Sequence, residues 1–180
     1  RSRYIESGKT GHIITLATEH RSVLEPLRQI QREGFAITEL KPNPDGLIST
    51  QSLINSLQRD TFLVSLMTAN NEIGVIQPIL DVSRICKDRG IIFHSDSAQS
   101  FGNIPLENFS HGLDLMTISA HKIYGPKGIG ALINSSNLPI APLHWGGGQE
   151  GGIRSGTLPV PLIVGFAKAV EIAFADLKDR

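Results

Sequence analysis

Short apolar runs alternate with helical stretches along almost the whole sequence, and this alternation limits the folds that the chain can adopt. Strand-like runs occupy residues 12–17, 35–40, 62–67, 91–93, 113–118 and 130–133. Helical patterns occupy residues 22–32, 50–58, 78–89 and 159–176. Strands that alternate with helices at this spacing favour a mostly parallel sheet with helices on both faces. The sequence therefore predicts an α/β fold with three layers, α/β/α.

Glycine, proline and short polar residues mark the ends of these segments. Gly34 and Gly90 follow two helical patterns, at the position where glycine commonly ends a helix. Ser49 or Thr50 is the expected cap of the helix at residues 50–58. No low-complexity linker or internal repeat interrupts the pattern, so we expect residues 1–180 to form one domain.

Composition excludes several classes of protein. Seventeen basic residues balance seventeen acidic ones, so no net charge draws the chain toward nucleic acid or an anionic membrane. No apolar segment has the roughly 18 residues of a membrane-spanning helix. The single cysteine, Cys86, excludes an internal disulfide and suits a reducing compartment. The chain opens on Arg1-Ser2-Arg3 without methionine, so we expect both ends to be cuts in a longer intracellular protein.

Polar side chains follow the predicted strands, where ligands gather in open parallel sheets. Lys122 comes shortly after the strand at 113–118, and a neutral lysine amine can form a Schiff base with an aldehyde when its surroundings are desolvated. Asp96 ends the preceding strand, and a carboxylate there can hold a pyridinium nitrogen protonated. Taken singly, Lys122 is more typical of an ordinary surface loop and Asp96 of a loop cap. Together they fit a pyridoxal site.

Other residues at this edge also have more than one interpretation. His20 follows the first strand, where its imidazole could stack on an aromatic ring, move a proton as a catalytic group, or simply cap the next helix. Asn70-Asn71 could contact a ligand or only form a turn, and Gln99 lies close enough to Asp96 to reach the same ligand. The glycine-rich stretches at 146–148 and 154–157 could bind phosphate, although they match no nucleotide-binding fingerprint.

Five motifs, in order and in register, resemble the NifS/IscS-like cysteine desulfurases. This family is a branch of the class V aminotransferases, which are pyridoxal-phosphate (PLP) enzymes of fold type I. The motifs are TEHRSVLEP at 18–26, NNEIGVIQP at 70–78, HSDSAQSFG at 94–102, SAHKIYGPKGIGAL at 119–132 and GGGQEGGIRSGTLP at 146–159. The resemblance implies the PLP-binding large domain of such an enzyme.

The resemblance also implies roles for individual residues. Lys122 corresponds to the lysine that binds the cofactor and moves protons at the substrate, and His20 to the imidazole stacked on the cofactor ring. Asp96 corresponds to the partner of the pyridine nitrogen. Gln99 and Asn71 correspond to residues near the phenolic oxygen.

The cofactor phosphate has its own implied ligands. Ser119 and His121 match phosphate ligands of the same subunit. Thr157 matches a residue that reaches the phosphate of the neighbouring subunit in a homodimer. No metal is implied.

The implied reaction removes sulfur from L-cysteine, giving alanine and an enzyme-bound persulfide for iron–sulfur cluster assembly or tRNA thiolation. The implied partners are a homodimeric second subunit and an iron–sulfur scaffold or other sulfur-acceptor protein. Cys86 does not match the family's catalytic loop, so we expect it to be a packing residue. Residues 1–180 are expected to be the central part of the large domain, without the N-terminal segment and the small domain with the cysteine loop, and inactive in desulfuration alone.

Two alternatives remain. The parent could be a selenocysteine lyase or another class V aminotransferase-like enzyme, or the piece could be non-catalytic and bind no PLP. The expected location is cytoplasmic, or mitochondrial in a eukaryote.

Overall fold

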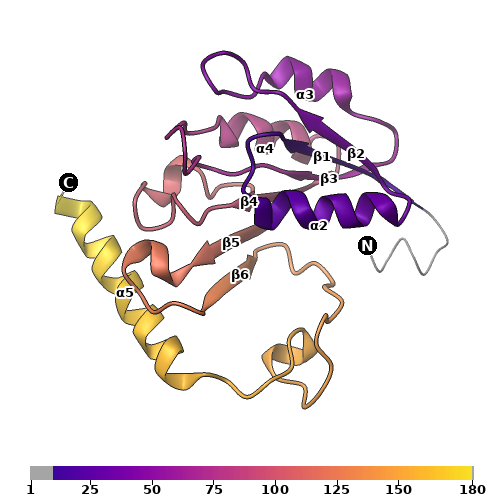
Figure 1. Cartoon of the computed structure of the whole chain (residues 1–180). Coiled ribbons are helices and arrows are strands. Elements are labelled where there is room, and N and C mark those ends of the chain that lie inside the picture. The colour runs from indigo at the N-terminus through magenta and orange to yellow at the C-terminus, as the bar shows by residue number, and fades with distance from the viewer. Residues whose placement is uncertain (1–9, 180) are drawn as a thin grey trace.

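The computed structural model describes residues 10–179, which form a six-stranded sheet flanked by helices (Figure 1). The opening Arg1-Ser2-Arg3 lies outside the described residues. The elements follow in the order β1 (His12–Leu16), α2 (Arg21–Arg32), β2 (Ala36–Leu40), α3 (Thr50–Ser56), β3 (Thr61–Ser65), α4 (Ile79–Lys87), β4 (Ile92–Asp96), η1 (Leu106–Asn108), β5 (Leu115–Ser119), η2 (Ala120–Ile123), β6 (Gly130–Asn134), η3 (Glu150–Gly152) and α5 (Val160–Asp179).

The sheet has the strand order β2-β1-β3-β4-β5-β6. Each neighbouring pair from β2 to β5 is parallel, and only β6 runs antiparallel to its neighbour β5. The predicted mostly parallel sheet is therefore confirmed. The carboxyl ends of β1, β3, β4 and β5 consequently meet at one edge of the sheet.

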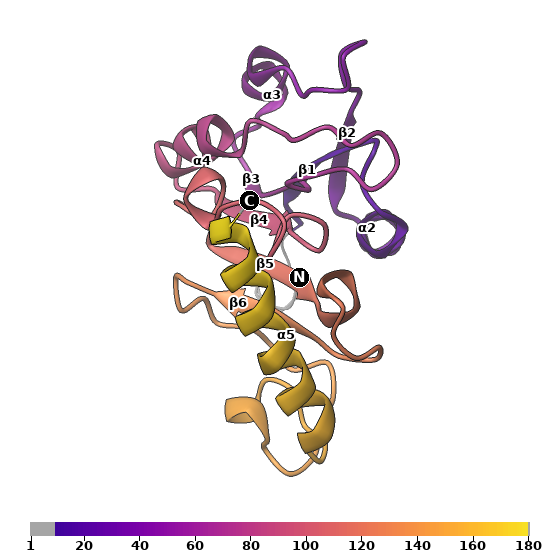
Figure 2. The same cartoon turned by 90° about the vertical axis from the view of Figure 1, so that its left-hand side faces the viewer.

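Helices cover both faces, as the strand–helix alternation predicts. Figure 2 shows α2 on one side of the sheet and α3 and α4 on the other. Side chains of the strands alternate between the two faces. In β4, Phe93 is fully buried in the main core, which also includes Val82 of α4 and Phe166 of α5. Its neighbours His94 and Asp96 face the opposite side and are only partly buried.

The predicted helix ends are set by local chemistry. Ser49 caps α3, because its hydroxyl accepts a hydrogen bond from the backbone N–H of Ser52 at 3.1 Å. Gly34 and Gly90 have φ values of +98° and +64°, which favour glycine at the helix ends that they follow. Within residues 10–179, no helix combines the length and the apolar character needed to span a bilayer.

Candidate active site

A cavity of about 470 Å³ opens at the carboxyl edge of the sheet. Its lining side chains come from the ends of β1, β3, β4 and β5 and from the start of α2. They are His20, Ser22, Val23, Met67, Ala69, Asn71, His94, Asp96, Ala98, Gln99, Thr117, Ser119, His121 and Lys122. The structure therefore brings seven of the eight sequence-predicted site residues together, and Thr157 is the exception.

Lys122 is held by a short helix that immediately follows β5. The neighbouring side chains Ala120 and Ile123 are buried in the core and anchor this turn, η2, from below. Tyr124 ends the turn with a φ of +62°, and Gly125 donates its backbone N–H to the Ala120 carbonyl at 2.9 Å. Lys122 lines the cavity but is exposed, so these residues do not by themselves provide the desolvated surroundings expected from the sequence.

Asp96 stabilises a turn and also lines the cavity, while its role toward a pyridine nitrogen stays a prediction. Its Oδ1 atom accepts a hydrogen bond from the backbone N–H of Ala98 at 3.0 Å, which stabilises the turn after β4. Its side chain also lines the cavity. Because β4 and β5 pair in parallel, with Asp96 opposite Thr117, the carboxylate and the Lys122 turn lie at the ends of adjacent strands.

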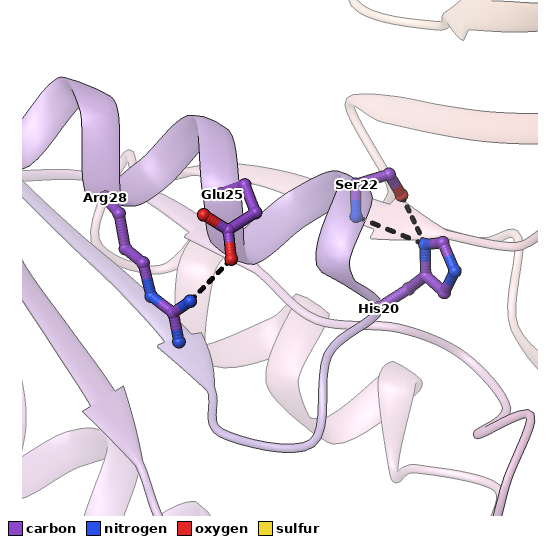
Figure 3. Close-up of polar contacts among 4 residues, drawn as sticks. All are labelled: His20, Ser22, Glu25 and Arg28. Atoms are coloured by element: carbon purple, nitrogen blue, oxygen red, sulfur yellow. Dashed lines mark hydrogen bonds and ion pairs between the residues drawn. The ribbon is translucent and has the colours of Figure 1, made fainter.

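His20 likewise combines two roles. It is the N-cap of α2, and its Nδ1 atom accepts the backbone N–H of Ser22 at 3.2 Å and lies 2.7 Å from the Ser22 hydroxyl (Figure 3). Because Nδ1 is an acceptor, the proton of the neutral ring lies on Nε2. The ring lines the cavity, so capping fixes the tautomer that it presents there.

The two asparagines after β3 have different roles. The buried Asn70 organises the turn: its Oδ1 accepts the N–H groups of Glu72 and Ile73, at 2.8 and 2.9 Å. Asn71 is exposed and lines the cavity, as does the half-buried Gln99.

His94 is a cavity residue without a role in the sequence-based prediction. It lies two residues before Asp96, on the same face of β4. Its Nδ1 is 2.8 Å from the Ser65 hydroxyl and its Nε2 is 3.3 Å from the Thr117 hydroxyl, so the ring bridges β3, β4 and β5 beneath the site. Burial lowers the pKa of His94, against the opposing effect of Asp96. The i, i+2 spacing to Asp96 was the signal that could have identified it.

Glu19 also had no role in the prediction, although it directly precedes His20. Its side chain is 5% exposed, and its Oε1 accepts the backbone N–H of Met67 at 2.5 Å. The pKa of Glu19 is raised to about 8, because burial outweighs the opposing hydrogen bond from Met67 and nearby Asp96 adds a smaller increase. Sequence periodicity gives no sign of a carboxyl group buried in a loop.

Two further predictions concern residues outside the cavity. Thr157 is exposed in the loop between η3 and α5 and does not line the cavity; its role toward a neighbouring subunit stays a prediction.

Cys86 is 1% exposed in the core, and burial raises the pKa of its thiol to about 12. The expectation that Cys86 is a packing residue is confirmed. Among residues 10–179, no three His, Cys, Asp or Glu side chains are grouped to hold a metal ion.

Comparison with known proteins places this geometry in a family. The family profile described as "Aminotransferase class-V" matches residues 3–178. The cysteine desulfurase IscS of Rickettsia africae is 50% identical over 174 residues, which are 96% of this chain and 42% of that protein. The chain thus spans less than half the length of this relative.

Solved structures of related proteins have a similar fold. DndA from Streptomyces lividans superposes with a TM-score of 0.91 and 42% identity, over 97% of this chain and 51% of that one. SspA, solved in complex with cysteine, gives a TM-score of 0.86 and 41% identity, over 94% of this chain and 50% of that one. The sheet, its flanking helices and the match along nearly the whole chain leave one assignment: the chain belongs to the class V aminotransferase family and has the large-domain fold of type I PLP enzymes.

Proposed function

We propose that the cavity binds pyridoxal 5′-phosphate and that the protein containing this chain is a cysteine desulfurase. The observation that carries the proposal is the meeting of Lys122 and Asp96 in one cavity, at the ends of adjacent strands. A primary amine and a carboxylate on one sheet edge match the two ends of a pyridoxal ring, its aldehyde and its nitrogen.

The described residues fit the cofactor in size and in chemistry. The cavity of about 470 Å³ lies in the range of roughly 300–1,000 Å³ found for small-molecule sites. Bound PLP would supply an electron-withdrawing ring. Lys122 would hold its aldehyde carbon, Asp96 would keep its ring nitrogen protonated, and His20 would present its fixed tautomer to the ring. Asn71 and Gln99 offer amide groups for the phenolic oxygen, and Ser119 and His121 offer donors for the phosphate.

The proposed substrate is L-cysteine, which would lose its sulfur and leave alanine. The identity with IscS of Rickettsia africae and the complex of the related SspA with cysteine support this substrate. The reaction needs an accessible thiolate to accept the sulfur. Cys86, the only cysteine of the sequence, is buried with a raised thiol pKa, so we propose that the acceptor thiol comes from outside these 180 residues.

The proposed assembly is a homodimer that passes sulfur to an iron–sulfur scaffold or another acceptor, in the cytoplasm. Exposed apolar side chains support a large interface for the segment around Thr157. They include Leu143 at 81%, Trp145 at 84% and Val164 at 62% exposure, all in the segment that flanks Thr157.

The first test measures the visible absorbance of the purified protein with PLP, followed by borohydride reduction and peptide mapping. We expect a visible band of bound cofactor and a reduced adduct on Lys122. Lys122→Ala should lose both, because it removes the amine that holds the aldehyde carbon.

Lys127→Ala is the matched control, since Lys127 is exposed a few residues away and does not line the cavity. It should label at Lys122 like the unmodified protein. Adducts spread over several lysines, or an unchanged band in Lys122→Ala, would refute the proposed cofactor site.

A further inference from the structure

The loop that carries His20 is tied to the end of β3 by a buried carboxyl group. Glu19 Oε1 accepts the Met67 N–H at 2.5 Å. Beside it, the Asn70 side-chain amide donates to the Thr18 carbonyl at 2.8 Å. Met67 lines the cavity, and Asn70 precedes the cavity residue Asn71. These bonds therefore join the loop after β1 to the loop after β3, and both loops contribute to the wall of the cavity.

Burial of the Glu19 carboxyl group is energetically unfavourable. Its side chain is 5% exposed, and within residues 10–179 its Oε2 atom has no hydrogen-bond partner. A buried carboxyl oxygen without a hydrogen-bond partner is energetically unfavourable. We propose that Glu19 is a positioning residue of the PLP site, whose carboxyl group fixes the His20 loop against the end of β3. This inference rests on the proposed cofactor.

The charge state of Glu19 follows from its surroundings. The titratable groups at this edge are His20 beside it, His94 and Asp96 on β4, and His121 and Lys122 on η2. Burial, with a smaller contribution from Asp96, raises the pKa of Glu19 to about 8. At neutral pH Glu19 therefore holds a proton and adds no negative charge beside Asp96. Above pH 8 the ionised Glu19 places a negative charge near Asp96.

Two substitutions at residue 19 separate the effect of its hydrogen-bond acceptor from the effect of its charge. Glu19→Gln keeps an oxygen acceptor for the Met67 N–H and stays neutral, whereas Glu19→Ala removes the acceptor. Glu25→Ala is the matched control, because Glu25 lies on α2, is exposed and pairs with Arg28 on the same helix (Figure 3). Each protein is prepared in its full native length.

The first measurement uses cofactor-free protein and follows hydrogen exchange of the Met67 amide. We expect exchange to be about 10- to 100-fold faster in Glu19→Ala, as loss of a hydrogen bond to a carboxyl group implies. Glu19→Gln and Glu25→Ala should stay near the wild-type rate. Equal exchange in all four proteins would overturn the inference, whether or not PLP binds.

The second measurement is the PLP dissociation constant, from fluorescence quenching between pH 6.5 and 9. At pH 6.5 we expect Glu19→Ala to bind at least tenfold more weakly and Glu19→Gln to bind within about twofold of wild type. Above pH 8 the wild type should weaken relative to Glu19→Gln, because PLP is a net anion and Glu19 then carries charge. Lower stability of Glu19→Ala with an unchanged dissociation constant would show a merely structural role. Absence of PLP binding by the wild type would refute the cofactor proposal and leave the exchange result to decide on Glu19.

Discussion

Single residues at this site perform local structural tasks and face the cavity at the same time. His20 accepts the Ser22 N–H and thereby caps α2, and Asp96 accepts the Ala98 N–H and stabilises the turn after β4. Both side chains line the cavity. A cap that also lines a cavity has little freedom to rotate, so the structural task orients the group for a ligand. For these residues the two interpretations offered by the sequence do not exclude one another.

The ionisation of Glu19 predicts an alkaline loss of stability. Its pKa is raised from 4.5 to about 8 in the folded protein, so between these values the folded state holds a proton that the unfolded chain has released. The free energy of unfolding must then fall as pH rises, by at most about 1.4 kcal/mol per pH unit. His12 and His94, whose pKa values are lowered below 6.5 by burial, act in the opposite direction below pH 6.5.

Between pH 6.5 and 8, the pH dependence of the free energy of unfolding therefore reports mainly on the ionisation of Glu19. Urea unfolding across this window should show wild-type stability declining and Glu19→Gln almost constant. Parallel curves for the two proteins would mean that Glu19 ionises normally in the folded state.

At the scale of elements, strand–helix periodicity predicts the order and type of the main segments, and their ends differ by up to three residues. β3 shows why: a strand was expected at 62–67, but it ends at Ser65, and the Met67 N–H donates to the Glu19 side chain instead of to a strand. The strand-end rule likewise predicts where Lys122 and Asp96 lie. It does not predict Glu19 or His94, because their hydrogen bonds join residues that are 48 and 29 positions apart. Such partners are set by tertiary packing.

The first turn of α2 allows the two tasks of His20 to be separated. His20→Ala should lower the free energy of unfolding by about 1 kcal/mol through loss of the cap, and should weaken PLP binding. His20→Asn should recover the stability, because asparagine is a good N-cap, but not the affinity, because it has no imidazole. Urea unfolding and PLP titration measure the two effects.

Ser49→Ala provides the matched control, since Ser49 caps α3 and does not line the cavity. It should cost similar stability at unchanged PLP affinity. Full recovery of affinity in His20→Asn would argue against a role for the imidazole.

At the scale of the molecule, α5 packs back onto the part of the chain that carries the site. Ala169 and Phe166 join the core with Ile123 of η2, and Phe174 contacts Phe101 edge-on at a ring distance of 5.1 Å. A Cβ atom added at Gly102 would lie 2.7 Å from Ile123 Cγ2 and 2.9 Å from Ala173 Cβ. The loop after β4, the Lys122 turn and α5 therefore meet at Gly102.

This meeting point predicts different costs for two glycine substitutions. Gly90 and Gly102 both have positive φ, +64° and +75°, but a Cβ at Gly90 has nothing within 4 Å. Gly90→Ala should lower the free energy of unfolding by about 1–2 kcal/mol through backbone strain alone. Gly102→Ala should cost roughly 1–3 kcal/mol more, because it also forces α5 and η2 apart. Equal losses in urea unfolding would show that α5 adapts freely.

The packing of α5 against η2 also has a consequence for the order in which the protein matures. A chain emerging from the ribosome presents its N-terminal segments first. The strands that hold His20, Asn71 and Asp96 are thus available before residues 160–179 exist. The Lys122 turn rests on Ala120 and Ile123, whose core is closed by Phe166 and Ala169 of α5. The lysine is therefore the last of these groups to be fixed in place, so a nascent chain exposes an incomplete pocket until α5 has been made.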